Sequence, residues 1–298
     1  MNILITGSRG FIGSHLGNRL VELGHNVTGV DSGLNLSDNK TNFFSGELNF
    51  QDIDPEDLKK TDVVVHLAAS INVDESIKEP RQYFENNARG TFLLLEKIRL
   101  FNPGLKFIYA SSAEVYGSAR YPKMTEDHPL DPLSPYAVSK LSAEQFCKTY
   151  GQLYGIDVTV VRNFNTFGEY QRGGVYGGVI AKFASLAKKG ESPIVYGSGE
   201  QMRDYMYIKQ AVDGYVLAIE RKLPSIINFG SGVPIRIVDI ANFIGTYFGV
   251  SVEHSAARPN EIMRLEADVT RATLYGYRIQ TDFWKDLEKY LEFVKNNG

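Results

Sequence analysis

The sequence has a single cysteine and a single tryptophan, and it has no apolar run long enough to cross a membrane. Cys147 alone cannot form an internal disulfide or a cysteine-based zinc site. Its place in a helical stretch favours a buried structural thiol, and we expect no bound metal. Met1 leads straight into a strand-like segment without a signal peptide, so we expect a cytoplasmic protein with no membrane partner. The net charge of −3 gives no basic surface that would indicate a nucleic-acid partner.

Strand and helix patterns alternate through the first part of the chain. The 298 residues can hold one large domain or two modest ones, and a hydrophobic content of 43% allows a sizeable core. Apolar runs predict strands at 2–5, 27–30, 43–48, 63–67, 106–110 and 158–161. Helical patterns lie at 11–23, 55–60, 80–100 and 134–154. Six strands joined by crossover helices predict an α/β fold with a doubly wound parallel (Rossmann) sheet over residues 1–163.

The pattern changes after Arg162, where glycines become frequent and the elements shorten. Helices are predicted at 179–189, 209–221, 237–248 and 282–295, and strands at 194–196, 205–208 and 226–229. We therefore expect a smaller, interleaved C-terminal α/β lobe over residues 164–298, with some elements returning to the first sheet. Ligands of such folds bind beyond the carboxyl ends of the strands, so we expect the substrate between the two lobes.

The first 31 residues read as strand, glycine turn, helix, strand and acid. Gly7 permits a tight turn, and Gly10 leaves the helix N-terminus open to a pyrophosphate. Gly13 allows the helix to pack closely on the sheet. Asp31 lies 18 residues beyond Gly13, where a carboxylate can accept both ribose hydroxyls of a dinucleotide. Glycines also make plain turns, but this combination predicts dinucleotide binding. Ser32 rather than arginine follows the acid, which favours NAD over NADP.

Two polar positions indicate chemistry. Ser112 ends the fifth strand, and Tyr136 precedes Lys140 by four residues, so both side chains lie on one helical face. An ammonium near the phenol would lower the pKa of Tyr136 from about 10 towards 7 and make it a general base. The alternative is an ordinary surface pair, because this spacing is common.

Further stretches match one family: HLAA at 66–69, NNARGT at 86–91, SSAEVYG at 111–117, RNFN at 162–165, GSGEQMRDY at 197–205, NFGSG at 228–232 and ARPNE at 257–261. With the glycine turn and the Tyr136/Lys140 pair, they resemble the extended short-chain dehydrogenases/reductases of the NAD-dependent nucleotide-sugar epimerase/dehydratase family. The similarity covers nearly the whole chain and is greatest to UDP-glucose (UDP-galactose) 4-epimerases.

The resemblance implies NAD as cofactor and a UDP-hexose as substrate. Ser112 would bind the sugar O4, Tyr136 would take its proton, and Lys140 would hold the nicotinamide ribose. A transient 4-keto sugar would receive the hydride back on its other face. The cofactor residues would be Gly7, Gly10, Phe11, Ile12, Asp31, Glu47, Leu48, Leu67, Ala68, Ala69, Asn86, Tyr136 and Lys140.

The family also assigns substrate residues and a partner. These residues would be Ser112, Glu114, Asn165, Arg203, Arg258 and Leu265, with Asn165 and both arginines on the diphosphate. Guanidinium groups suit phosphate oxygens, which agrees with this assignment. Homodimers are usual in the family, through helices near 80–100 and 134–154. His66 is interpreted as a structural strand-end residue.

Three departures leave alternatives open. Glu114 stands where UDP-glucuronate decarboxylases and sugar dehydratases carry a glutamate, whereas Ala113 removes the acid that dehydration needs. Leu265 replaces a bulky tyrosine of strict hexose epimerases and leaves room for an N-acetyl group. A decarboxylase, reductase or dehydratase of the same family is therefore an alternative, and a non-catalytic NAD(H)-sensing protein is another.

Overall fold

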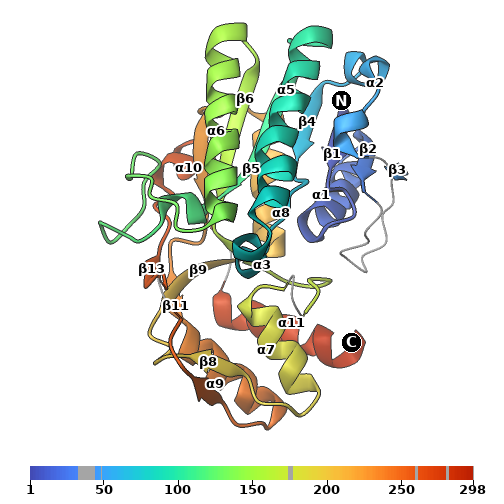
Figure 1. The fold of residues 1–298 in the computed structure, drawn as a ribbon. Helices are drawn as coiled ribbons and strands as arrows, with labels where there is room; N and C mark the ends of the chain where they lie inside the picture. Colours follow the sequence, from blue (N-terminus) through green and yellow to red (C-terminus); the bar gives the residue numbers. More distant parts are fainter. Residues whose placement is uncertain (33–43, 48, 174–176, 259–260, 280–281, 298) are drawn as a thin grey trace. The chain divides into compact units, whose positions relative to one another are not determined.

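A computed structural model describes residues 1–32, 44–47, 49–173, 177–258, 261–279 and 282–297 (Figure 1). The chain forms two compact units. The first unit comprises Met1–Val115, Pro132–Arg162 and Val212–Ile227, and the second unit comprises Tyr116–Asp131, Asn163–Ala211 and Asn228–Gly298. The division expected between residues 163 and 164 stays a prediction about domains. Residues 116–131 precede this division but belong to the second unit, and residues 212–227 follow it but belong to the first unit.

A seven-stranded sheet forms the centre of the first unit, in the order β10-β6-β5-β4-β1-β2-β3. The strands are β1 (Asn2–Thr6), β2 (Asn26–Asp31), β3 (Phe44–Glu47), β4 (Val63–His66), β5 (Lys106–Ser112), β6 (Asp157–Asn163) and β10 (Ile226–Phe229). Neighbours from β3 to β5 pair in parallel. The doubly wound fold is confirmed, and strand order reverses between β1 and β4. The sheet has a seventh strand, β10, because this late segment adds to the edge beside β6.

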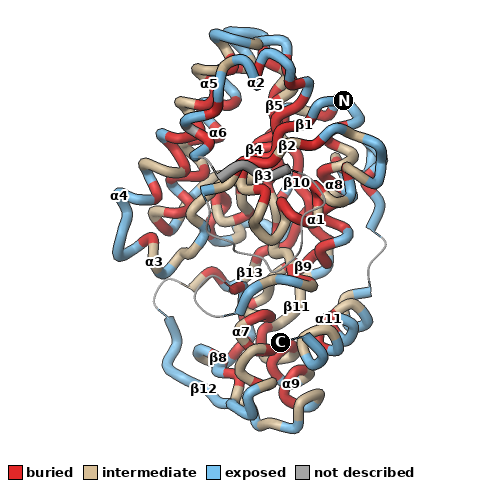
Figure 2. Tube along the Cα trace, turned by 90° about the vertical axis from the view of Figure 1, so that its right-hand side faces the viewer, coloured by how far each residue is buried: buried red, intermediate tan, exposed pale blue. Residues whose placement is uncertain are grey.

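Helices cover the sheet because its strands are apolar on both faces. They are α1 (Phe11–Glu22), α2 (Pro55–Lys59), α3 (Val73–Lys78), α4 (Pro80–Tyr83), α5 (Gly90–Phe101), α6 (Pro135–Tyr154) and α8 (Ile208–Glu220), with short 3-10 turns at Phe50–Asp52 and Ala113–Tyr116. Helices α5 and α6 lie side by side over one face (Figure 1). The core there joins Leu4, Val64 and Phe107 of the sheet to side chains that include Leu94 and Cys147. Figure 2 shows strands β1 and β4 buried and the outer segments of α2 and α5 exposed.

The single helix predicted at 80–100 is wrong in detail. Helix α4 is followed by a π-helical turn, Phe84–Arg89, before α5 begins at Gly90. Asn87 lies within this wider turn and is buried, where its amide donates to Ser70 O and to Ser139 Oγ. The turn thus binds the loop after β4 to α6.

Helix α6 has strong end signals in its sequence. Ser134 Oγ accepts the N–H of Ala137 at 3.1 Å, and Pro135 occupies the first turn. Gly155 ends the helix with φ +72°. The helix predicted at 134–154 is confirmed.

The second unit contains two small sheets. β7 (Asn165–Phe167), β9 (Met202–Tyr207), β11 (Pro234–Arg236) and β13 (Arg264–Leu265) form one, and β8 (Ile194–Tyr196) pairs with β12 (Glu253–Ser255) in the other. The helices are α7 (Val179–Lys188), α9 (Ile237–Phe248), α10 (Thr270–Leu274) and α11 (Phe283–Asn297). β9 begins earlier than predicted because Met202 pairs with Arg236 of β11. Within the described residues, none of the helices has the length and apolarity needed to span a membrane.

Candidate functional site

The glycine turn after β1 is as tight as its sequence predicts. Gly7 has φ +70°, and a Cβ there would lie 2.7 Å from the N atom of Ala68. A Cβ on Gly13 would lie 2.2 Å from Gly7 O. Gly10 caps α1 without a side chain, and no acidic residue stands in the first turn of the helix. The turn therefore leaves the N–H groups at Phe11 and Ile12 in a setting that suits a pyrophosphate.

Asp31 lies beside this turn at the end of β2. Its carboxylate accepts the N–H of Arg9 at 3.0 Å, which fixes it against the glycine loop. The backbone of β3 places Glu47 opposite Asp31. Leu48 and residues 33–43 lie outside the described residues. The acid, the turn and the helix N-terminus together fit the adenosine diphosphate half of NAD.

The exit of β4 carries Leu67, Ala68 and Ala69, and the backbone of Leu67 and Ala68 lies against Gly7. Thr6 Oγ1 accepts the N–H of Ala68 at 3.2 Å and lies 2.7 Å from His66 Nδ1. His66 Nε2 lies 3.0 Å from Thr91 Oγ1, which donates to Asn87 O. Both ring nitrogens are thus engaged, and burial lowers the pKa of His66 to about 3. His66 is a neutral structural residue, as predicted.

Asn86 lies in the π-helical turn Phe84–Arg89. Its amide Nδ2 donates to Ser70 Oγ at 3.2 Å, in the loop beyond Ala69. The loop after β4 and the π-helical turn therefore carry adjacent candidate cofactor residues.

The three candidate catalytic residues come from two neighbouring elements. Ser112 ends β5, whereas Tyr136 and Lys140 lie one turn apart on α6. The Ser112 hydroxyl lies close enough to the Tyr136 phenol to oppose the rise of its pKa. Ser112 Oγ also accepts the N–H of Glu114 at 3.2 Å. The structure thus brings Ser112 and Tyr136 close together, with Glu114 beside them.

The prediction that Lys140 lowers the pKa of Tyr136 is wrong for the chain without cofactor or substrate. Burial raises the pKa of Tyr136 to about 12, and the charge of Glu114 adds to the effect, while the nearby Ser112 hydroxyl opposes it. Burial also lowers the pKa of Lys140 to about 7. The Lys140 ammonium lies 4.5 Å from the centroid of the Tyr109 ring. Desolvation of both groups outweighs the attraction that their spacing suggested.

The candidate diphosphate residues already have partners within the second unit. Arg203 donates to Glu261 Oε1 at 2.9 Å and to Ile262 O at 2.5 Å. The guanidinium of Arg258 lies 4.1 Å from the centroid of the Tyr196 ring. A phosphate that binds these arginines would compete with a carboxylate and an aromatic face.

Asn165 and Leu265 lie on the strands that flank β9. Asn165 Nδ2 donates to Asp204 O at 3.2 Å. Leu265 pairs with Arg203 across β13 and β9, and its side chain is buried. The second unit therefore gathers Asn165, Arg203 and Leu265 around one strand.

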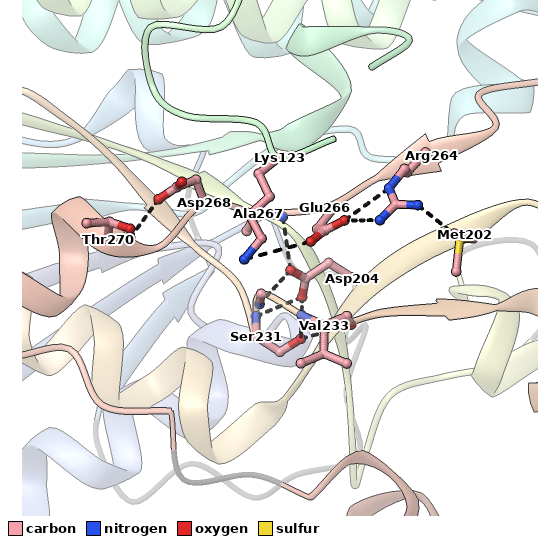
Figure 3. Close-up of polar contacts among 11 residues, drawn as sticks. Lys123, Met202, Asp204, Ser231, Val233, Arg264, Glu266, Ala267, Asp268 and Thr270 are labelled. Atoms are coloured by element: carbon pink, nitrogen blue, oxygen red, sulfur yellow. Dashed lines mark hydrogen bonds and ion pairs between the residues drawn. The ribbon is translucent and has the colours of Figure 1, made fainter. Parts of the chain in front are cut away.

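Asp204 is a residue whose role the sequence analysis missed. Its buried carboxylate accepts the N–H groups of Ser231, Gly232 and Ala267 at 2.7, 2.8 and 3.1 Å, and also the Ser231 hydroxyl (Figure 3). It thereby ties the strand of Arg203 to the chain just after Leu265. Its sequence signal was an acid directly before the strand predicted at 205–208, in the stretch GSGEQMRDY.

Glu144 was also missed. Its carboxylate accepts the Ser111 hydroxyl and forms a buried ion pair with Arg162. The signal was available, because Glu144 follows Lys140 by one helical turn and so lies on the same face.

The part of the chain that the structure describes has no group of three or more His, Cys, Asp or Glu side chains that could hold a metal ion. Cys147 is buried, as predicted.

Comparisons with known proteins show which family the chain belongs to. Residues 3–230 match the NAD dependent epimerase/dehydratase family. A putative UDP-glucose 4-epimerase of Methanocaldococcus jannaschii is 33% identical over 304 residues, which cover 99% of each chain. The solved NAD-dependent NDP-hexosamine 5,6-dehydratase TunA, of tunicamycin biosynthesis, has a TM-score of 0.93 at 31% identity and covers 100% of this chain and 98% of its own.

A second solved structure is the UDP-N-acetylglucosamine 4-epimerase of Methanobrevibacter ruminantium M1. It has a TM-score of 0.90 at 32% identity and covers 98% of this chain and 97% of its own. The names of these relatives all refer to enzymes of nucleotide sugars, but they differ in the sugar and in the reaction. The chain belongs to the NAD-dependent epimerase/dehydratase family of nucleotide-sugar enzymes and is an epimerase-like enzyme whose cofactor is NAD.

Proposed function

We propose that this enzyme catalyses the NAD-dependent 4-epimerisation of a UDP-hexose through a transient 4-keto sugar. The observation that carries the proposal is the placement of Ser112 at the end of β5, close to Tyr136, which lies one helical turn before Lys140 on α6. Ala113 lies where dehydratases place an acid, so the chain lacks the proton donor for a leaving hydroxyl. Residues 1–163 would mainly bind NAD, and residues 164–298 would mainly bind the nucleotide sugar.

The side chains divide the chemistry between them. When bound, NAD supplies a hydride acceptor for the sugar C4 and a positive charge. Ser112 would hydrogen-bond the sugar O4, and Tyr136 would remove its proton and later return it. Burial raises the pKa of Tyr136 to about 12 in the chain alone. Tyr136 would therefore accept the proton only when NAD and the nucleotide sugar are both bound. Lys140 would hold the nicotinamide ribose.

The sugar diphosphate would take its partners from the second unit. Arg203 and Arg258 would bind phosphate oxygens, and Asn165 would contact the same group. Arg203 would then give up its ion pair with Glu261 and form charge-assisted hydrogen bonds to the phosphate. Leu265 is shorter than tyrosine, which supports acceptance of N-acetylhexosamines as well as plain hexoses.

A homodimer would bury the outer faces of α5 and α6. Leu100 is 59% exposed and Leu153 is 69% exposed, although both are large apolar side chains. Exposed apolar side chains on adjacent helices are typical of a subunit interface.

Tyr136→Phe tests whether the enzyme is catalytic through this residue. The phenyl ring keeps the packing against Tyr83 and removes only the hydroxyl. We expect loss of turnover with NAD affinity retained, measured by NAD titration and by product formation from UDP-galactose. Unchanged turnover would remove Tyr136 from the reaction, and an inert wild-type enzyme that still binds NAD would favour the sensing alternative.

Decarboxylation of a UDP-glucuronate is the second candidate, favoured by Glu114. Its charge raises the pKa of Tyr136, so this carboxylate lies near the reacting group. Release of carbon dioxide from UDP-glucuronate, lost in Glu114→Gln, would move the assignment to a decarboxylase.

A further inference from the structure

Lys140 is a buried cation with an unusual neighbour. Its side chain is 3% exposed, yet none of the ion pairs formed by the described residues includes it. The group that faces its ammonium is the ring of Tyr109, at 4.5 Å from the ammonium to the ring centroid. Tyr109 lies on β5, three residues before Ser112, and is fully buried. The π face of an aromatic ring attracts a desolvated cation.

The other titratable groups around Lys140 interact with residues other than Lys140. From β4, His66 is neutral and bonded at both ring nitrogens. On α6, Tyr136 lies close to Ser112, and the carboxylate of Glu144 binds Ser111 of β5 and Arg162 of β6.

Cys147, one further turn along α6, is a buried thiol, and burial raises its pKa well above the ordinary value. The charge of Glu144 favours protonated Lys140 from a distance. The Tyr109 ring is therefore the close contact that compensates the ammonium for burial.

We propose that Tyr109 is a positioning residue that keeps Lys140 protonated and in place through the face of its aromatic ring. Its hydroxyl is not the active part, because burial raises the pKa of Tyr109 well above the ordinary value and the phenol stays neutral. The catalytic consequence rests on the proposed function, whereas the effect on Lys140 does not.

The test compares three variants of the full chain. Tyr109→Phe keeps the ring and removes the hydroxyl, and Tyr109→Leu removes the ring. Phe107→Leu is the matched control, since Phe107 is a fully buried aromatic residue on the same strand and on the same face, and no cation of the described residues lies over its ring. The pKa of Lys140 is read by NMR from ¹³Cε-labelled lysine, with the signal assigned through Lys140→Arg.

We expect Tyr109→Leu to lower the pKa of Lys140 by about 0.4–1.5 units, the range of a cation–π contact. Tyr109→Phe and Phe107→Leu should leave it unchanged. In turnover measurements, the alkaline limb of kcat should move to lower pH by the same amount in Tyr109→Leu only. Circular dichroism shows whether each variant is folded, and a Tyr109→Met variant replaces Tyr109→Leu if that one does not fold.

Two outcomes would overturn the inference: an unchanged Lys140 pKa in the variant without the ring, or an equal shift in Tyr109→Phe. If the Lys140 pKa shifts as expected but the wild-type enzyme epimerises no UDP-hexose, the proposed function fails and the role of Tyr109 stands. If the wild-type enzyme epimerises a UDP-hexose but the pKa of Lys140 does not change in Tyr109→Leu, the proposed function stands and the role of Tyr109 fails.

Discussion

Glu144 and Arg162 form an ion pair in which both side chains are almost fully buried, with 2.8 Å between Arg162 Nη2 and Glu144 Oε2. Arg162 Nε also donates to Glu144 Oε1 at 3.1 Å, and Ser111 Oγ donates to the same oxygen at 2.5 Å. The pair joins α6, which carries Lys140, to strands β5 and β6. The candidate catalytic elements are therefore held together by one buried charge cluster.

Glu144→Gln should lower the free energy of unfolding by about 3–5 kcal/mol, because it leaves the guanidinium of Arg162 buried without a counter-charge. Chemical denaturation followed by circular dichroism measures the change. The control is Glu22→Gln, which breaks the exposed pair of Arg19 and Glu22 and should cost at most about 1 kcal/mol. An equal loss of unfolding free energy in the two variants would show that the buried pair contributes no more to stability than the exposed one.

Gly13→Ala should weaken NAD binding at least roughly tenfold, since about 1.4 kcal/mol suffices for that factor. The new methyl group would lie 2.2 Å from Gly7 O and would force the glycine turn away from α1. Isothermal titration with NAD measures the affinity. Gly104→Ala is the control, because a Cβ there meets only Asn102 Oδ1 at 3.8 Å. Undiminished affinity in Gly13→Ala would mean that the turn does not hold the cofactor.

His66 should make stability fall in mild acid. Its pKa is about 3 in the fold, against the usual value of 6.5, so between these values the unfolded chain binds more protons than the folded one. The contribution of neutral His66 is fully present above pH 6.5 and is lost as the pH falls towards 3. The stability of the wild type should therefore decrease by up to about 1.4 kcal/mol per pH unit more steeply than that of His66→Gln.

Denaturation midpoints between pH 7 and 5 measure this slope. The control is His254→Gln, at an exposed histidine, which should keep the wild-type slope. Parallel curves for wild type and His66→Gln would contradict a neutral buried His66.

Asp204→Asn should weaken UDP-sugar binding and leave NAD binding intact. The amide nitrogen would face backbone N–H donors of the Ser231–Gly232 loop or of Ala267, at a cost of about 1–3 kcal/mol. The strands that carry Arg203 and Leu265 would then lose their shared anchor. Titration with UDP and with NAD separates the two effects.

Asp127→Asn serves as the control for Asp204, since Asp127 is exposed and its partner among the described residues is Arg271. A variant Asp204→Asn that binds UDP as the wild type does would show that Asp204 stabilises the fold without positioning the substrate residues.

The sequence was sufficient for the fold class because local patterns determine it. Alternating apolar runs and helices, the glycine turn and the Ser134 cap all lie within a few residues of what they specify. The seventh strand, β10, was not assigned to the first sheet, because residues 164–225 separate it from its neighbour β6, and most of these residues belong to the second unit. Likewise, the π-helical turn depends on bonds from Asn87 to Ser70 and Ser139, which lie far away in the sequence.

The candidate site was predictable in position but not in electrostatics. The spacing of Tyr136 and Lys140 correctly placed them one turn apart, but the pKa of Tyr136 depends on how deeply the fold buries it. The partners of Lys140 and Asp204 come from distant parts of the chain, such as Tyr109 on β5 for Lys140 and the Ser231–Gly232 loop for Asp204. Only the packed structure reveals them.

The most direct test of the account is proton NMR of the purified enzyme with NAD, incubated separately with UDP-galactose, UDP-N-acetylgalactosamine and UDP-glucuronate. We expect the matching gluco epimer to appear from the first two, at comparable rates if Leu265 leaves room for the N-acetyl group. Turnover of UDP-galactose without its N-acetylated analogue would contradict the role of Leu265. Loss of the carboxylate carbon from UDP-glucuronate, with no epimer from either hexose, would contradict 4-epimerisation itself.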